Sequence, residues 1–245
     1  MIRKYSTKEV FVRRIATSEV FIIPKHFGSL WDIYYISIFI VVIPFVIGLL
    51  TFRHFTAELR MFFLFVAYGV FNEFISAFIV KIIGVNNNLP LHHLYGLITF
   101  LILGIFYRYL LAGYIKQKWI DIIIVLYTIY YLINSLFLQS IYEYPGVARA
   151  IGTFVILLLI ILYFAKVMQE AKIRNLFAEP VIWISGGLLI YYAYNLFYFI
   201  LFNLLIDFSM EFAELVTFYR VGVNVLVYTM ISIAFVKQHK WQIRV

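Results

Sequence analysis

Two ionisable residues stand inside long apolar stretches of the sequence. Glu73 lies in the apolar range 60–83, and Arg220 lies in the range 212–237. A charged group in lipid costs about 2.5–3.5 kcal/mol on insertion scales, so such residues commonly mark a binding site or an ion path. If both ranges are helices, a rise of about 1.5 Å per residue places the two residues at similar depth, roughly 12–15 Å from the same end of the bundle.

Further polar residues fall in the same layer. Tyr191, Asn195 and Tyr198 recur at spacings of three and four, so they share one face of a helix, and Asn224 lies one turn from Arg220. The set predicts an outward-opening polar pocket for a small ligand, a lipid or an ion. Its predicted residues are Asn72, Glu73, His92, His93, Tyr191, Asn195, Tyr198, Arg220 and Asn224. The cytoplasmic half of the apolar ranges shows no equivalent polar set, and this asymmetry favours a pocket that opens to the outer side.

Structural interpretations of these residues stay open. Glu73 and Arg220 are also suited to neutralise each other as a buried pair that fixes helix packing, or to carry a proton. His92 and His93 stand where the third apolar range begins, and neighbouring helix positions do not face one site together. A water-exposed helix end and a metal ligand are therefore competing interpretations for the two histidines, and we expect no metal site.

Several chemistries are excluded or disfavoured by what the sequence lacks. There is no cysteine, which removes disulfides, thiolate nucleophiles and iron–sulfur ligation. A retinal Schiff base requires a lysine within the last helix, but Lys237 and Lys240 lie at or beyond its end. There is no His-Glu-x-x-His motif either. With no catalytic set of residues, we expect neither an enzyme nor a cofactor.

The elements that position these residues follow from composition. Hydrophobic residues make up 64% of the chain and charged residues only 13%, which is typical of an integral membrane protein. We predict an all-α bundle of seven transmembrane helices over residues 31–245, preceded by a basic tail over residues 1–30. The apolar ranges are 33–52, 60–83, 92–113, 119–139, 149–168, 180–205 and 212–237.

Loop charges predict the orientation. Cations concentrate in the connections after the first, third and fifth ranges and in the C-terminal tail, whereas the other connections offer only Lys81 and Arg149. The positive-inside rule therefore puts the C-terminus in the cytoplasm and the N-terminus outside, although the basic tail counts against it. The net charge of +8 then indicates that the basic loops contact lipid headgroups of the bilayer rather than nucleic acid.

Two segments carry a family resemblance. Leu91–Tyr107 (LHHLYGLITFLILGIFY) and Glu179–Asn203 (EPVIWISGGLLIYYAYNLFYFILFN) resemble the third and sixth helices of a family of uncharacterised bacterial seven-helix inner-membrane proteins. Members of that family are often encoded beside sensor histidine kinases, and the chain is more distantly similar to the seven-helix sensor modules of bacterial receptors. The resemblance implies a location in the bacterial inner membrane.

These observations lead to three functional hypotheses. The first is a sensory or signalling module that binds a ligand in the outer pocket and couples to a cytoplasmic or membrane signalling protein. The second is a transporter or channel for a small solute or ion, and the third is a structural subunit of a larger membrane complex. An intramembrane enzyme has no residue set to support it.

Overall fold

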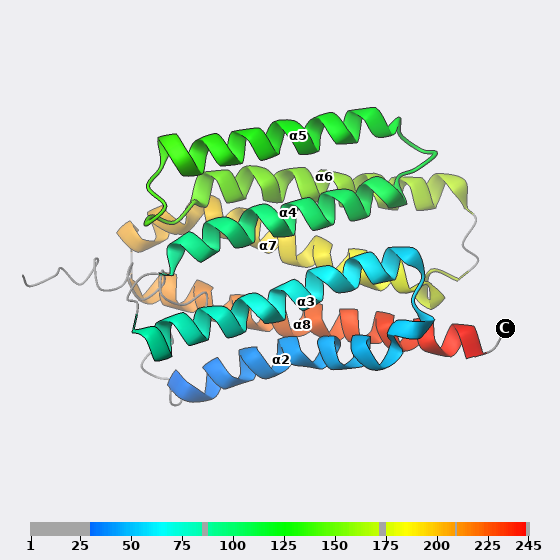
Figure 1. The fold of residues 1–245 in the computed structure, drawn as a ribbon, viewed down its shortest axis with the longest axis horizontal. Helices are drawn as coiled ribbons and strands as arrows, with labels where there is room; N and C mark the ends of the chain where they lie inside the picture. Colours follow the sequence, from blue (N-terminus) through cyan, green and yellow to red (C-terminus); the bar gives the residue numbers. More distant parts are fainter. Residues whose placement is uncertain (1–29, 85–87, 172–174, 209, 244–245) are drawn as a thin grey trace, which may run out of the picture.

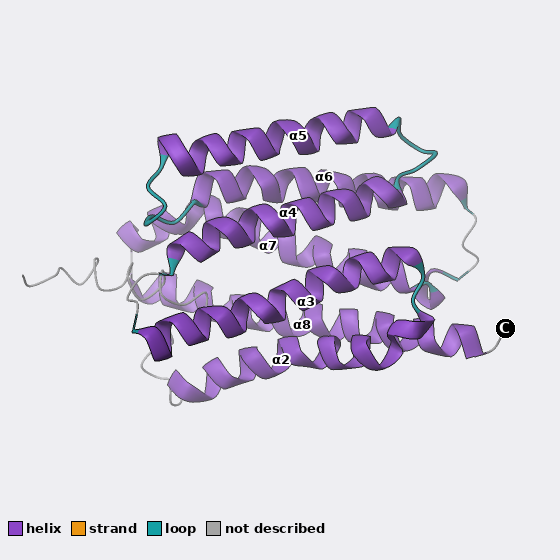
Figure 2. Cartoon of the chain, viewed as in Figure 1, coloured by secondary structure: helices purple, strands orange, loops and turns teal. Residues whose placement is uncertain are grey.

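The computed structural model describes residues 30–84, 88–171, 175–208 and 210–243. The basic tail predicted for residues 1–30 lies, except for its last residue, outside the described residues. Within the described part, the chain forms helices joined by short connections, and no strand is present (Figure 2). The all-α prediction is confirmed.

Within the described residues, seven long helices run side by side and alternate in direction (Figure 1). Their bounds are α2 Leu30–Thr51, α3 Ala57–Phe78, α4 Leu89–Leu110, α5 Gln117–Ile133, α6 Gly146–Glu170, α7 Pro180–Phe208 and α8 Met210–Ile243. Two short π-helical segments, η2 Ile79–Ile83 and η3 Asn134–Leu138, continue α3 and α5. Each predicted apolar range overlaps one of these helices, although the ranges 60–83, 92–113 and 119–139 extend beyond the ends of α3, α4 and α5.

Six of the described helices are long and apolar enough to cross a membrane. They are the helical stretches Ala57–Phe78, Leu89–Leu110, Gln117–Leu138, Gly146–Glu170, Pro180–Ile200 and Tyr219–Gln238. In α2 the apolar stretch that qualifies among described side chains is the shorter Ile40–His54. Large apolar side chains such as Leu50 and Phe137 point out of the bundle, where hydrocarbon is the favourable solvent for them.

Aromatic side chains fill the core of the bundle. The rings of Phe55 and Phe63 both contact Phe235, so α8 packs against the α2–α3 corner. Tyr107 of α4 is fully buried and donates a hydrogen bond to Ser185 Oγ of α7 over 3.1 Å. α5 lies at the edge of the bundle, where it packs on α4 (Figure 1).

Two ends of the bundle are distinguished below. The end at which α4, α6 and α8 begin is called the predicted outer end, and the end at which they finish is called the predicted cytoplasmic end. The names follow the orientation expected from loop charge.

Candidate ligand site

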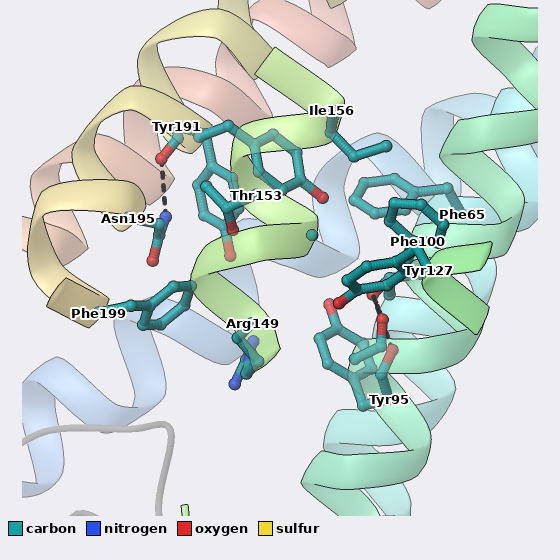
Figure 3. Close-up of a pocket in the computed structure, with 14 residues that line it drawn as sticks. Phe65, Tyr95, Phe100, Tyr127, Arg149, Thr153, Ile156, Tyr191, Asn195 and Phe199 are labelled. Carbon is teal, nitrogen blue, oxygen red and sulfur yellow. Dashed lines mark hydrogen bonds between the residues drawn. The ribbon is translucent and has the colours of Figure 1, made fainter. Parts of the chain in front are cut away.

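A small cavity near the predicted outer end brings together side chains from five helices (Figure 3). The centre of a water-sized sphere can occupy about 40 Å³ of it. Its lining residues are Phe65 of α3, Tyr95, Gly96, Thr99 and Phe100 of α4, Tyr127 of α5, Arg149, Gly152, Thr153 and Ile156 of α6, and Tyr191, Tyr192, Asn195 and Phe199 of α7. Most of the polar groups are hydroxyls, and one is a cation.

Arg149 supplies the positive charge of this cavity. It lies in the first turn of α6 and is only 9% exposed. A cation is disfavoured there by the helix dipole, so other groups must stabilise it. Its Nη1 donates to the Tyr144 hydroxyl at 3.1 Å, and its guanidinium carbon lies 4.9 Å from the centre of the Phe199 ring. Contact with the aromatic face offsets part of the cost of burial.

Asn195 also lines the cavity and carries a buried acceptor. The residue is 1% exposed, and its Nδ2 donates to the Tyr191 carbonyl oxygen at 2.8 Å (Figure 3). That bond turns Oδ1 away from Tyr191, and no described residue donates a hydrogen bond to it. Leaving a buried acceptor in this condition costs about 1–3 kcal/mol. A ligand that brings its own donor would recover this free energy.

Gly152 allows Tyr127, one of the tyrosines that line the cavity, to pack closely against α6. A β-carbon added to Gly152 would lie 2.2 Å from the Tyr127 hydroxyl, so only glycine permits the observed packing of α5 on α6. The Tyr127 hydroxyl donates to the Ala148 carbonyl oxygen at 2.9 Å, and its ring lies 3.9 Å from that of Phe100. Tyr127 is therefore held firmly in place.

Of the nine predicted pocket residues, Tyr191 and Asn195 line this cavity. Tyr198 and Arg220 lie next to it: the Arg220 guanidinium carbon is 5.0 Å from the centre of the Tyr198 ring and 6.0 Å from that of Phe199. Arg220 is 8% exposed, and one turn along α8 the Oδ1 of Asn224 is buried. One ring, Phe199, thus lies near the guanidinium groups of both Arg149 and Arg220.

Asn72 and Glu73 are not among the residues that line the cavity. Both lie on α3, Asn72 buried at 6% exposure and Glu73 half-buried. The Glu73–Arg220 pair stays a prediction.

His92 and His93 are buried, with exposures of 3% and 5%, so the interpretation of a water-exposed helix end is wrong. The turn before α6 lies against His93, whose Nε2 is 2.9 Å from the Glu143 carbonyl oxygen and whose Nδ1 is 2.8 Å from Ser135 Oγ. His93 therefore ties α4 to the end of α5 and to the following loop. The described residues hold no cluster of three or more histidine, cysteine or acidic groups suited to a metal.

Sequence reasoning missed a second, larger cavity at the predicted cytoplasmic end. Its volume is about 740 Å³, it is partly open to the surface, and its polar lining includes Glu58, Glu170, Glu179, Lys166 and Gln238. The expectation that this half has no polar set is wrong, because these residues come from the ends of three different helices and from the turn before α7, far apart in the sequence.

Two charged residues of the larger cavity, Lys166 and Glu179, interact with neighbouring groups. Lys166 Nζ donates to the carbonyl oxygens of Leu110 and Ala112 at 2.7 and 2.9 Å. Burial raises the pKa of Glu179, and the nearby Glu58 carboxylate raises it further, while a hydrogen bond from the Val181 backbone amide opposes both. A packed layer separates the two sets of lining residues along α6 and α7, where Ile160, Ile184 and Leu188 are at most 1% exposed.

The chain was also compared with known proteins. No protein-family model, no curated protein and no solved structure matches the chain.

Proposed function

We propose that the chain is a seven-span membrane protein, with its N-terminus outside and its C-terminus in the cytoplasm, that binds a small polar ligand in the outer cavity and signals its presence to a partner protein. The observation that carries this proposal is the buried Oδ1 of Asn195, which accepts no hydrogen bond from a described residue and shares a cavity with Arg149. A ligand that donates a hydrogen bond to this acceptor would remove the cost of leaving it unsatisfied.

The route of the signal follows from which helices hold the ligand. Arg149 belongs to α6 and Asn195 to α7, so a ligand bound between them changes the preferred spacing of these helices. Phe199 contacts both Arg149 and Arg220, which joins this spacing to the position of α8. At its other end α8 reaches the predicted cytoplasmic surface, where Gln238 Nε2 donates to the His54 carbonyl oxygen at 3.2 Å.

The partner we propose is a cytoplasmic or membrane signalling protein. The resemblance of Leu91–Tyr107 and Glu179–Asn203 to proteins encoded beside sensor histidine kinases supports a kinase in this role. A bacterial inner membrane is the location that goes with this proposal.

The test measures movement at the predicted cytoplasmic end when the outer cavity fills. Because the chain has no cysteine, spin labels can be attached at Glu170→Cys and Val236→Cys, two exposed positions on α6 and α8. In proteoliposomes we expect the label distance to shift on addition of bicarbonate, acetate, phosphate or glycine, and Asn195→Leu to abolish the shift. Binding of one of these compounds with an unchanged distance would contradict the signalling proposal.

A transporter is the second candidate, favoured by the 740 Å³ cavity at the opposite end of the bundle. Two cavities lie on either side of the packed layer around Ile160 and Ile184. This arrangement is compatible with alternating access, in which a substrate site opens first to one side of the membrane and then to the other. Flux of a radiolabelled ligand into proteoliposomes that Asn195→Leu abolishes would favour transport. Retained binding without flux would favour the sensor.

A further inference from the structure

The larger cavity at the predicted cytoplasmic end holds more negative than positive charge. Its lining includes the carboxylates of Glu58 and Glu179 and the ammonium group of Lys166. Neither of these two glutamates forms a salt bridge with a described residue. Lys166 Nζ donates instead to the carbonyl oxygens of Leu110 and Ala112. Even when the Lys166 charge is set against one carboxylate, one negative charge is left over, so this wall of the cavity favours a cation.

Glu179 is the common neighbour of the groups that form this wall. Burial and the nearby Glu58 carboxylate both disfavour its charged form, and the hydrogen bond from the Val181 backbone amide offsets only part of that effect. The amide brings a dipole but no full positive charge. A cation placed between the two carboxylates would attract both and would remove their mutual repulsion.

The Tyr163 hydroxyl is a second, independent sign of a ligand. Tyr163 lines the cavity from α6, is 6% exposed, and is close enough to Glu179 for the two groups to interact electrostatically. No described residue forms a hydrogen bond with its hydroxyl. A polar group buried in this condition recovers free energy from a ligand that supplies the missing partner. The hydroxyl oxygen accepts N–H donors, so a cation that carries N–H groups suits both the charge and the hydroxyl.

We infer that the larger cavity binds a small organic cation with N–H donors, an alkylammonium or a guanidinium group, held by the carboxylates of Glu58 and Glu179 and by the Tyr163 hydroxyl. A metal ion suits the cavity less well, because no three histidine, cysteine or acidic groups among the described residues are placed to hold one. The site lies across the packed layer from the outer cavity, so the inference goes beyond the proposed function and does not rest on it.

Putrescine, which carries a primary ammonium group at each end, is the probe for this site. Binding of ¹⁴C-putrescine to the purified full-length protein in phosphatidylcholine nanodiscs is measured by equilibrium dialysis. Two unlabelled competitors separate charge from hydrogen bonding: 1,4-butanediol has no charge, and hexamethylputrescine keeps both charges but has no N–H group. We expect butanediol not to compete. We expect the hexamethyl compound to compete about tenfold more weakly than putrescine, since loss of a hydrogen bond to a buried group accounts for that ratio.

Variants assign the recognition elements. Glu58→Gln and Glu179→Gln should each weaken putrescine binding at least tenfold. Tyr163→Phe should weaken putrescine several-fold and leave competition by the hexamethyl compound unchanged, which distinguishes the loss of a hydrogen bond from the greater bulk of that compound. Thermal unfolding of each variant checks that it is folded.

Glu143→Gln is the matched control, because Glu143 is an exposed carboxylate at the predicted outer end. It makes the same change in net charge and should leave putrescine binding unchanged. Binding that survives Glu179→Gln in a folded protein, or that falls equally in Glu143→Gln, would overturn the inference. So would equal competition by putrescine and butanediol in the wild-type protein.

The headgroup of phosphatidylethanolamine offers the same ammonium chemistry as a free amine. Nanodiscs that contain this lipid separate the two sources: competition between the lipid and putrescine that Glu179→Gln relieves would assign the site to the headgroup, and the inference of a free cation would then be wrong. Failure of putrescine to bind is also distinguishable from failure of the signalling proposal, which is tested by filling the outer cavity and by Asn195→Leu.

Discussion

Gly152 has no room for a β-carbon, because the Tyr127 hydroxyl and its ring carbon Cζ lie 2.2 and 2.6 Å from where that atom would stand. Tyr127 is 6% exposed, and its packing against Phe100 and its hydrogen bond to the Ala148 carbonyl oxygen resist a shift of its ring. We expect Gly152→Ala to lower the free energy of unfolding by about 1–3 kcal/mol, the usual cost of overpacking. Thermal unfolding of the purified protein in detergent measures the effect.

Gly222→Ala provides the control for this change. It makes the same substitution in α8, where no atom lies within 4 Å of the added carbon. The greater helix propensity of alanine should leave that variant as stable as the wild type or slightly more stable. If both variants unfolded at the same temperature, the close packing of Tyr127 on α6 would be refuted.

At the scale of elements, one buried hydrogen bond joins α4 to α7 through the layer between the two cavities. Tyr107 is fully buried, and its hydroxyl donates to Ser185 Oγ. Ser185→Ala leaves that hydroxyl without its acceptor and should cost about 1–3 kcal/mol, whereas Tyr107→Phe should cost about 1 kcal/mol. The double variant should lose at least about 0.5 kcal/mol less than the sum of the two single variants, as measured by a double-mutant cycle. Strict additivity would show that the two residues do not stabilise each other.

The start of α7 predicts a pH effect. The pKa of Glu179 is raised above its ordinary value of 4.5, because burial and the Glu58 carboxylate disfavour its charged form in the folded protein. The folded state thus holds this proton more tightly than the unfolded state, and its contribution to stability is fully present below pH 4.5 and is lost as the pH rises through the raised pKa. We expect Glu179→Gln to be more stable than the wild type at neutral pH, with the difference vanishing in acid.

Unfolding temperatures recorded from pH 4 upward test this prediction. Glu170→Gln removes an exposed carboxylate from the lining of the same cavity and controls for the change in net charge. A neutral-pH gain of similar size in both variants would attribute the effect to overall charge rather than to burial of Glu179.

The helices could be predicted from the sequence, because long apolar ranges separated by charged connections leave few alternatives. The cavity was found only in part. Tyr191 and Asn195 share a helical face and were identified by spacing alone, whereas Arg149 was counted as a loop cation because it stands at a range boundary. Only the folded chain shows that Phe199, fifty residues later in sequence, covers the Arg149 guanidinium.

At the scale of the whole molecule, the orientation of the bundle is directly testable. The cysteine-free sequence allows single cysteines at Tyr142, exposed at the predicted outer end, and at Lys118, exposed at the predicted cytoplasmic end. In intact cells a membrane-impermeant maleimide should label Tyr142→Cys and not Lys118→Cys, and both should react after permeabilisation. The reverse pattern would invert the topology and make the larger cavity the outward one.

The length of α8 makes it a mechanical lever. Its 34 residues correspond to about 51 Å at a rise of about 1.5 Å per residue. Arg220 rests on Phe199 near one end of this rod, and Gln238 bonds to the His54 carbonyl oxygen near the other. Pivoting the rod by about 5° about its outer tip would carry the opposite tip sideways by about 4 Å. A displacement of the Phe199 ring that is small on the scale of one side chain would thus reach the predicted cytoplasmic end as a movement of about the diameter of a methyl group.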